Sequence, residues 1–336
     1  MPAGIALYAA YVPYWRIRKE EYQKAWGACH ADMMEKTVAD VDEDALTMAV
    51  AAGRRVLGHV DPGRVGVLAC ASTTFPYAEK ASAPAVAAAL GLPPNVDVIE
   101  TGACAACGAQ ALVAALELMA GGSRDLGLVL VADNPAARPG DEWEHALGAG
   151  AAALLLTRED PAVTVGGWTS RVRESLGSRL RLQGEPFLRD VGVRALAYDA
   201  AAAVAGPAVQ ELCERLGTGP SAYRHAVFTQ SGARQVEDLA RALGFTREQL
   251  TGGLLFRETG DTGAASAFLG LCAVLDDAGA GERVMLAACG SGAAAVAVDL
   301  AVRRAGARGG PSVRAQLDRK GYVDYVRYLK LRGHIL

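Results

Sequence analysis

Short apolar runs alternate with longer alanine-rich amphipathic stretches along this chain, an order typical of strands covered by helices. The apolar runs predict strands at Val65–Ala71, Val96–Glu100, Leu126–Ala132, Ala151–Thr157, His225–Phe228, Val284–Ala288 and Ala293–Leu300. The amphipathic stretches predict helices at Glu43–Leu57, Ala81–Leu90, Gln110–Ala120, Gln235–Leu243 and Ala264–Ala278. The pattern therefore indicates an α/β protein.

The two halves of the chain repeat one plan. The segments GACAACGAQALVAALELMAGG and DTGAASAFLGLCAVLDDAGAG each combine a small-residue loop with an apolar helix and a glycine stop, and an apolar strand follows each. This indicates an internal duplication. Both helices are apolar nearly all round, as expected of helices buried between two sheets. Trp168–Asp199 contains several arginines and two glycine turns, which predicts a linker and loop that forms a wall of the substrate entrance.

Small residues dominate the composition, with 67 alanines and 39 glycines among 336 residues. This permits close backbone packing, and the apolar fraction excludes disorder. No uncharged run is long enough to predict a membrane-spanning helix, and the N-terminal residues resemble no export signal. The seven scattered cysteines favour a reducing, cytoplasmic setting. A net charge of −3 without a basic block argues against a nucleic-acid partner.

Cys104 stands out as a candidate nucleophile. It follows a predicted strand and a Thr-Gly-Ala turn, and it precedes a helix of very small residues. A thiol at a helix N-terminus lies near unpaired N–H groups, so we expect its pKa to be lowered. A buried structural cysteine is the alternative.

Cys104 and Cys107 also form a C-x-x-C motif. The apolar helix argues against a redox pair. The chain also lacks the further ligands that a metal site would need.

Motifs spread over the whole chain resemble those of hydroxymethylglutaryl-CoA synthases. They include YVPYWRIRKEEYQKAWG, EKTVADVDEDALTMAV, FPYAEKAS, TGACAACGAQA, ARPGDEWEHALGAGAAALLL, QGEPF, FTQSGARQVEDLARALGF, GDTGAASAFLGLCAVLD, GERVMLAACGSGAAA and VDYVRYLKLRG. The resemblance implies the thiolase-type five-layered αβαβα fold, made of two duplicated halves that we place at residues 1–165 and 166–336. It also implies a homodimer and a coenzyme A or phosphopantetheine thioester as substrate, with no permanently bound cofactor or metal.

The resemblance assigns roles to two loops. It implies that Cys104 is acylated and that its own N–H, with a second N–H from the turn at Ser291, holds the thioester oxygen. Arg234 matches a position where the family often has a basic residue near the phosphates of coenzyme A. A solvent-facing helix charge is the alternative for Arg234.

The departures from the family pattern concern proton transfer. The position of the general acid/base glutamate is occupied by Thr73, and the F-H-Q-P-N histidine position is occupied by Thr229, followed by Gln230. A threonine cannot deprotonate an acetyl methyl group near neutral pH. We place all three side chains in the substrate pocket. Asp261 matches the asparagine of G-N-T and could act as a base or orient a substrate amine, or it could cap the following helix.

His145 occupies a position where the family usually has a tyrosine that lines the active-site cavity. Its ordinary pKa suits proton transfer, although a lone histidine on a helix is also commonly a packed or surface residue. The sequence therefore predicts an acyltransferase or condensing enzyme of specialised metabolism that uses an acyl-CoA or acyl-carrier-protein donor and does not perform ordinary hydroxymethylglutaryl-CoA synthesis. The alternatives are a non-catalytic or partner-dependent subunit and a Cys104/Cys107 redox protein.

Overall fold

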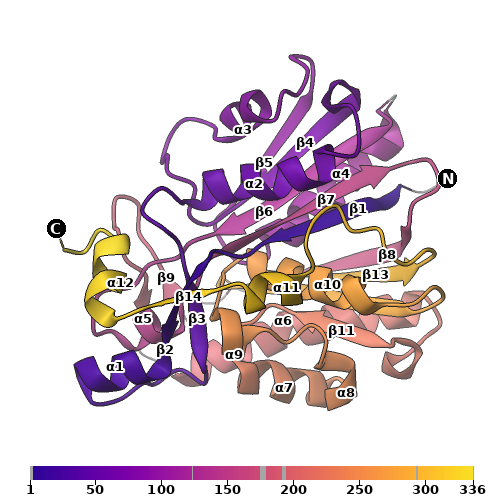
Figure 1. Ribbon diagram of the computed structural model, residues 1–336. Helices are drawn as coiled ribbons and strands as arrows, with labels where there is room; N and C mark the ends of the chain where they lie inside the picture. Colours follow the sequence, from indigo (N-terminus) through magenta and orange to yellow (C-terminus); the bar gives the residue numbers. More distant parts are fainter. Residues whose placement is uncertain (1–2, 123, 175–178, 191–193, 293, 336) are drawn as a thin grey trace.

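The computed structural model describes residues 3–122, 124–174, 179–190, 194–292 and 294–335. Within these residues, two groups of strands form one hydrogen-bonded sheet (Figure 1). The N-terminal group has the order β5 (Asp97–Thr101), β4 (Val65–Ala71), β6 (Leu126–Asp133), β7 (Gly150–Thr157) and β1 (Gly4–Tyr11). The C-terminal group has the order β11 (His225–Phe228), β12 (Arg283–Gly290), β13 (Ala294–Val302) and β8 (Val163–Val172).

The two groups repeat the same topology. In each, a parallel pair (β4 and β6, or β11 and β12) is followed by two antiparallel partners. Among the described strands, the two groups pair through β1 and β8, at Gly4 opposite Thr164 and Ile5 opposite Val163. The C-terminal group has no described counterpart of β5. The sheet order thus shows the duplication that the repeated sequence plan predicts.

Helices cover both faces of each group and form a third, shared layer between them. The outer layers consist of α2 (Ala45–Leu57) and α3 (Ala83–Ala89) on one side and α6 (Arg194–Arg215) and α7 (Ala233–Ala242) on the other. The shared layer consists of α4 (Cys107–Gly121) and α10 (Ala265–Asp277), which contact strands of both groups. This αβαβα order is the thiolase-type arrangement.

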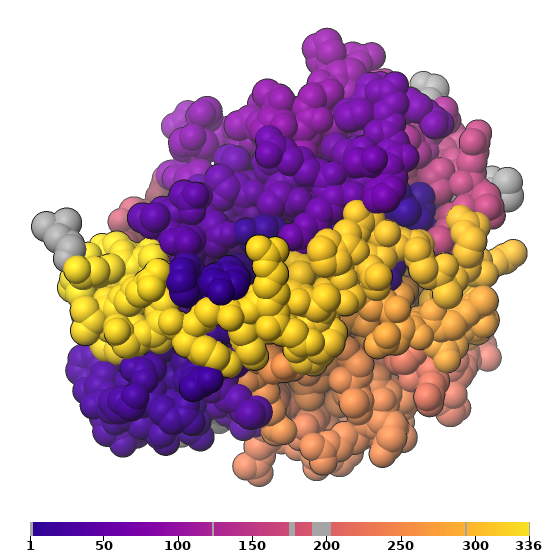
Figure 2. Space-filling model, in the orientation of Figure 1, coloured from indigo at the N-terminus to yellow at the C-terminus, as the bar shows by residue number. Residues whose placement is uncertain are grey.

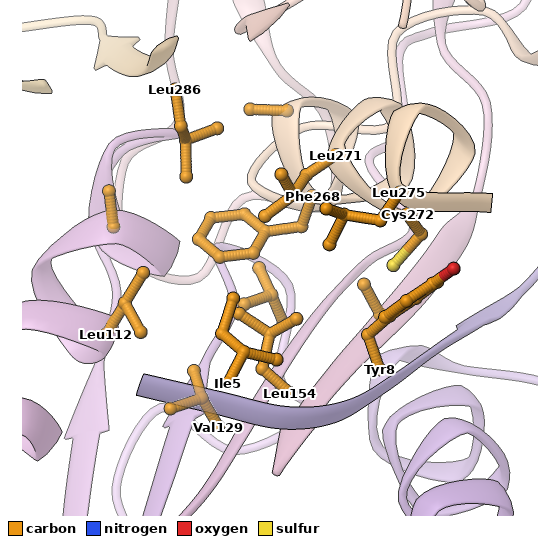
Figure 3. Close-up of a cluster of buried hydrophobic side chains, with 14 of the residues drawn as sticks. Ile5, Tyr8, Leu112, Val129, Leu154, Phe268, Leu271, Cys272, Leu275 and Leu286 are labelled. Carbon is orange, nitrogen blue, oxygen red and sulfur yellow. The ribbon is translucent and has the colours of Figure 1, made fainter. Parts of the chain in front are cut away.

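The central core lies around α4 and α10. Phe268 of α10 points into a cluster that draws side chains from both groups of strands, among them Val129, Leu154 and Leu286 (Figure 3). Close helix packing here requires small residues. A Cβ on Gly108 would lie 2.7 Å from the Phe268 ring, so the glycine in α4 lets the two central helices approach each other.

Shorter elements frame one end of the sheet. A three-stranded sheet has the order β14 (Gly321–Val323), β2 (Trp15–Arg18) and β3 (Glu35–Val38). The remaining elements are α1 (Lys19–Trp26), α5 (Glu142–Ala146), β9 (Arg179–Leu180), β10 (Arg189–Asp190), α8 (Arg247–Leu250), α9 (Phe256–Thr259), α11 (Val313–Asp318), α12 (Tyr325–Leu331) and two 3₁₀ turns, Pro62–Arg64 and Pro220–Ala222. The C-terminal segment, yellow in Figure 2, crosses the surface and returns to the N-terminal part of the molecule.

The strands and helices predicted from the sequence are confirmed within a few residues at their ends, except that Ala293, at the start of one predicted strand, lies outside the described residues. The prediction of a linker at Trp168–Asp199 is wrong at both ends. β8 continues to Val172, and α6 begins at Arg194. The proposed boundary at residue 165 falls inside β8. None of the helices in the described part of the chain is long and apolar enough to cross a membrane.

Candidate active site

Cys104 lies in the turn between β5 and α4. The turn is sharp because Ala103 has a φ of 73°, a left-handed conformation that is uncommon for a residue with a Cβ. The N–H of Cys107 donates to the carbonyl of Cys104 at 3.0 Å, and α4 begins there. The Cys104 side chain is only partly buried, whereas Cys107 is enclosed in the central core. This turn thus presents Cys104, and not Cys107, toward solvent.

Burial and the helix N-terminus act in opposite directions on the Cys104 thiol. Burial raises its pKa above the ordinary thiol value, while backbone hydrogen bonds from Ala106 and Cys107 lower it. Burial prevails, so the expectation of a lowered pKa is wrong for the free protein. The N–H groups at the start of α4 contact the sulfur as expected, but they offset only part of the desolvation. The thiol is therefore mainly protonated at neutral pH.

This balance predicts the pH dependence of alkylation at Cys104. Because the thiolate is the nucleophile and its pKa is raised, the rate should still be increasing above about pH 8.5, where an ordinary thiol is half ionised. Iodoacetamide labelling, followed at the Cys104 peptide by mass spectrometry across a pH series, measures this. A rate that reaches a plateau below about pH 8 would contradict the burial effect.

The Gly290–Gly292 turn touches Cys104 from the opposite half. A Cβ on Gly290 would lie 2.7 Å from the Cys104 Cβ and 2.8 Å from its Sγ, so only glycine fits there. Among the described residues, the Ser291 N–H has no acceptor, and this fits its expected role as an oxyanion donor. The Cys104 N–H, however, donates to the Gly102 carbonyl at 3.0 Å. The expectation of a free Cys104 donor is therefore not met in this conformation.

Asp133, at the end of β6, links the loops of both halves. Its fully buried carboxylate accepts hydrogen bonds from the Ser72, Thr73 and Thr74 hydroxyls at 2.8–2.9 Å. It also accepts the N–H groups of Thr73 at 2.8 Å and of Ala264 at 2.7 Å. Burial raises the Asp133 pKa, and these donors oppose the rise. We did not expect this residue from the sequence, although an aspartate at the end of the apolar run LGLVLVA was a usable signal.

Asp261 forms an ion pair with Arg179 of β9, with 2.6 Å between Oδ2 and Nη1. Its Oδ1 accepts the Gly263 N–H at 2.8 Å. Both carboxylate oxygens are thus occupied, so a role as general base would require the contact with Arg179 to break. The helix-cap alternative is also wrong, because Asp133 accepts the Ala264 N–H at the start of α10. The Arg179 guanidinium also lies 5.5 Å from the centre of the Trp143 ring.

Known relatives match the chain from end to end. The hydroxymethylglutaryl-CoA synthase of Methanosarcina acetivorans is 34% identical over 352 residues, covering 100% of this chain and 99% of the relative. That of Pyrococcus furiosus is 33% identical, covering 98% and 95%. The chain belongs to the hydroxymethylglutaryl-CoA synthase family.

Solved structures agree with this fold. The structure "MvaS in complex with 3-hydroxy-3-methylglutaryl coenzyme A" has a TM-score of 0.85 and 22% identity, covering 98% of this chain and 91% of that one. The curacin-pathway HMG synthase in complex with acetyl donor-ACP has a TM-score of 0.85 and 19% identity, covering 98% and 88%. Residues 213–301 match the C-terminal model of 3-oxoacyl-[acyl-carrier-protein] synthase III. This member of the hydroxymethylglutaryl-CoA synthase family is an acyl-condensing transferase with the thiolase fold.

Thr73 and Thr229, which the sequence resemblance places at proton-transfer positions, have structural partners. The Thr73 hydroxyl donates to Asp133. The Thr229 hydroxyl accepts the Cys289 N–H at 2.9 Å, next to the Gly290 turn. Both threonines are only partly buried, and their expected place in the substrate pocket stays a prediction.

Gln230 does not line the pocket as expected. It is buried, its Oε1 accepts the N–H groups of Leu255 and Phe256, and its Nε2 donates to the Gly253 carbonyl at 2.7 Å. Every polar atom of this side chain therefore holds the backbone before α9. The prediction of a substrate-pocket role is wrong because the side chain is fully used by the fold.

His145 also lies elsewhere. The residue is only 1% exposed. Its ring centre lies 4.6 Å from that of Tyr22, and the ring stacks on that of His30. The backbone N–H of His30 donates to the His145 Nδ1 at 3.2 Å. Trp143 contacts Arg179, and two residues along a helix differ by about 200° in direction. His145 therefore points away from the candidate site of this synthase relative, and the catalytic assignment is wrong.

Replacing His145 with phenylalanine should leave acylation of Cys104 unchanged and reduce the acid sensitivity of the fold. Burial and nearby Lys36 lower the His145 pKa to about 4, whereas the unfolded chain has an ordinary value near 6.5. The unfolded state therefore binds more protons, and stability is lost as pH falls from 6.5 toward 4. Urea unfolding at pH 7 and pH 4.5 measures this loss in both proteins. A variant with equal acid sensitivity, or with slower acylation, would contradict this placement.

The remaining predicted groups are on the surface or in the core. The Arg234 side chain is 87% exposed at the start of α7 and lies 3.9 Å from Asp238, so its role near the phosphates of coenzyme A stays a prediction. All seven cysteines are free, and burial raises the Cys107 pKa far above the ordinary range. Over the described residues, no group of three or more His, Cys, Asp or Glu side chains could hold a metal ion.

Proposed function

We propose that this chain forms an acyl thioester on Cys104 and transfers the acyl group without deprotonating an acetyl methyl group. In the first step the Cys104 sulfur attacks the donor carbonyl, and the bond from that carbon to the carrier sulfur breaks. The thiol proton of Cys104 passes to the departing thiolate, so the carrier leaves as a free thiol. The observation that carries the proposal is the close approach of Gly290 to Cys104, which leaves no room for a Cβ beside the Sγ and brings a donor-bearing turn next to the candidate nucleophile.

The second step is limited by the two threonines. Their hydroxyls have pKa values far above neutral and are already bonded to Asp133 and to the Cys289 N–H. The acceptor must therefore need little activation, as an amine, a hydroxyl or a carrier thiol does, or must supply a carbanion by decarboxylation or from an already acidic carbon. This chemistry differs from ordinary hydroxymethylglutaryl-CoA synthesis and suits specialised metabolism.

The carrier is proposed to be coenzyme A or the phosphopantetheine arm of an acyl carrier protein. Support comes from the similar structures whose names include 3-hydroxy-3-methylglutaryl coenzyme A and acetyl donor-ACP.

We also propose a homodimer. In the described sheet β5 is an edge strand, and Val98 on it is 44% exposed, which leaves a backbone edge and an apolar side chain to pair with a second copy.

Intact-protein mass spectrometry tests the proposal. The full-length protein is incubated with a panel of acyl-CoA and acyl-carrier-protein donors, beside the variants Cys104→Ala and Cys107→Ala. We expect an acyl adduct on the wild type and on Cys107→Ala, and none on Cys104→Ala. No adduct with any donor would favour the non-catalytic subunit, and equal complete losses in both variants would favour a paired-thiol mechanism.

A further inference from the structure

The Arg179 guanidinium holds a positive charge at the edge of the candidate site. Its partner Asp261 is fully buried, whereas 13% of the Arg179 side chain remains exposed. The Ser291 hydroxyl donates to the Arg179 carbonyl, so β9 is attached to the turn that touches Cys104. The Arg179 main chain therefore lies next to the turn beside Cys104, although it belongs to a segment that the sequence indicated only as a loop.

One edge of this guanidinium is open. Among bonds between described residues, only Nη1 of Arg179 has an acceptor, the Asp261 Oδ2. A guanidinium carries five N–H donors in a planar fork, so with respect to the described residues Nε and Nη2 keep their donors. The Trp143 ring, 5.5 Å from the guanidinium carbon, favours a fixed plane for the fork. The exposed part of the side chain gives a ligand a route to Arg179.

We propose that Arg179 binds a carboxylate of the substrate and that Asp261 is the positioning residue that orients it. This inference rests on the proposed acyl transfer at Cys104. The carboxylate belongs either to the acyl chain of the donor, as in a monothioester of a short dicarboxylic acid, or to an acceptor acid. If the ion pair only held β9 in place, the guanidinium would not need unpaired N–H donors. A guanidinium that binds a substrate carboxylate does need them. Bidentate arginine–carboxylate pairs are among the stronger hydrogen-bonded contacts in proteins.

Binding to the Cys104→Ala protein separates recognition from chemistry. In the first arm, calorimetry compares succinyl-CoA with butyryl-CoA, which share a four-carbon chain and differ in the terminal carboxylate. In the second arm, the same protein saturated with acetyl-CoA is titrated with acetoacetate and with acetoacetamide. We expect the anionic ligand to bind about tenfold more tightly or better in one arm, and that arm identifies the carrier of the carboxylate.

Three further substitutions in this background decide the role of the pair. Arg179→Gln should abolish the preference for the anionic ligand, and Asp261→Asn should increase it, because the guanidinium then has one carboxylate fewer. Arg189→Gln is the matched control, since Arg189 lies on neighbouring β10 and its side chain is 60% exposed. It should leave the preference unchanged.

Two results would overturn the inference. The first is the absence of an anion preference in both arms, and the second is a loss of the same size in Arg179→Gln and Asp261→Asn, as expected of a purely structural pair. Neither result bears on whether the wild-type Cys104 becomes acylated. Failure of the inference and failure of the proposed function are therefore distinguishable.

Discussion

Alanine at position 290 is expected to lower the rate of Cys104 acylation by at least about a hundredfold while the protein remains folded. The added Cβ would lie within 2.7–2.8 Å of the Cys104 Cβ and Sγ and of the Ala105 nitrogen. Two of these are side-chain atoms of the nucleophile itself, so the turn or the cysteine must move. A displacement of about 1 Å at a reacting centre costs about a hundredfold in rate. Quench-flow mass spectrometry of the acyl adduct measures the rate.

Gly121→Ala provides the matched control. Gly121 ends α4, the helix that follows Cys104, and a Cβ there meets nothing within 4 Å. This variant should acylate at the wild-type rate and unfold at the same or a slightly higher denaturant concentration. An acylation rate of Gly290→Ala within a few-fold of the wild type would show that the turn does not constrain the sulfur.

Asp133→Asn is expected to lower the free energy of unfolding by about 2–4 kcal/mol and to disable acylation. The carboxylate accepts five hydrogen bonds that join the Ser72–Thr74 loop to the start of α10. An amide has one oxygen, and its NH₂ group would face donors, so buried N–H and O–H groups would lose their acceptors. Urea unfolding measures the change in stability.

Asp318→Asn controls for the loss of one negative charge. The Asp318 side chain is 67% exposed and lies 3.9 Å from Arg314, so its contribution should stay within about 0.5 kcal/mol. If Asp133→Asn and Asp318→Asn had equal effects, Asp133 would not be the link between the two halves.

The regular elements were predictable because their signals are local. The strand at Val65–Ala71 is a continuous apolar run, and it is buried along its whole length between α2 and α4 layers. The whole of α6 was missed, and its first residues, Arg194–Asp199, were assigned to a linker because they contain arginine, tyrosine and aspartate without a clear apolar stripe. The five layers followed from the family resemblance, since periodicity does not say how two groups of strands stack with their helices.

The candidate site was predictable in part. Cys104 and the Ser291 turn were found because their local sequence is distinctive, and the structure brings them together from opposite halves. His145 was misassigned because sequence position does not give the direction of a side chain on a helix, and it is Trp143 that faces Arg179. Arg179 was missed because its partner Asp261 is 82 residues away in the chain. Long-range ion pairs leave no local pattern.

The Cys104 pKa shows how two physical effects compete. The sequence revealed the helix N-terminus that lowers it but not the surrounding burial that raises it. A raised pKa is compatible with acylation because the reacting thiolate need be present only as a minor fraction.

Mass spectrometry after incubation with acetyl-CoA in deuterium oxide tests the central claim most directly. The claim is that Cys104 is acylated while Thr73 and Thr229 leave the acetyl methyl group without a base. The account predicts an acetyl adduct on the Cys104 peptide whose methyl group retains all its protons through many turnovers of thioester exchange. Deuterium in that methyl group, or no Cys104 adduct from any donor, would contradict it.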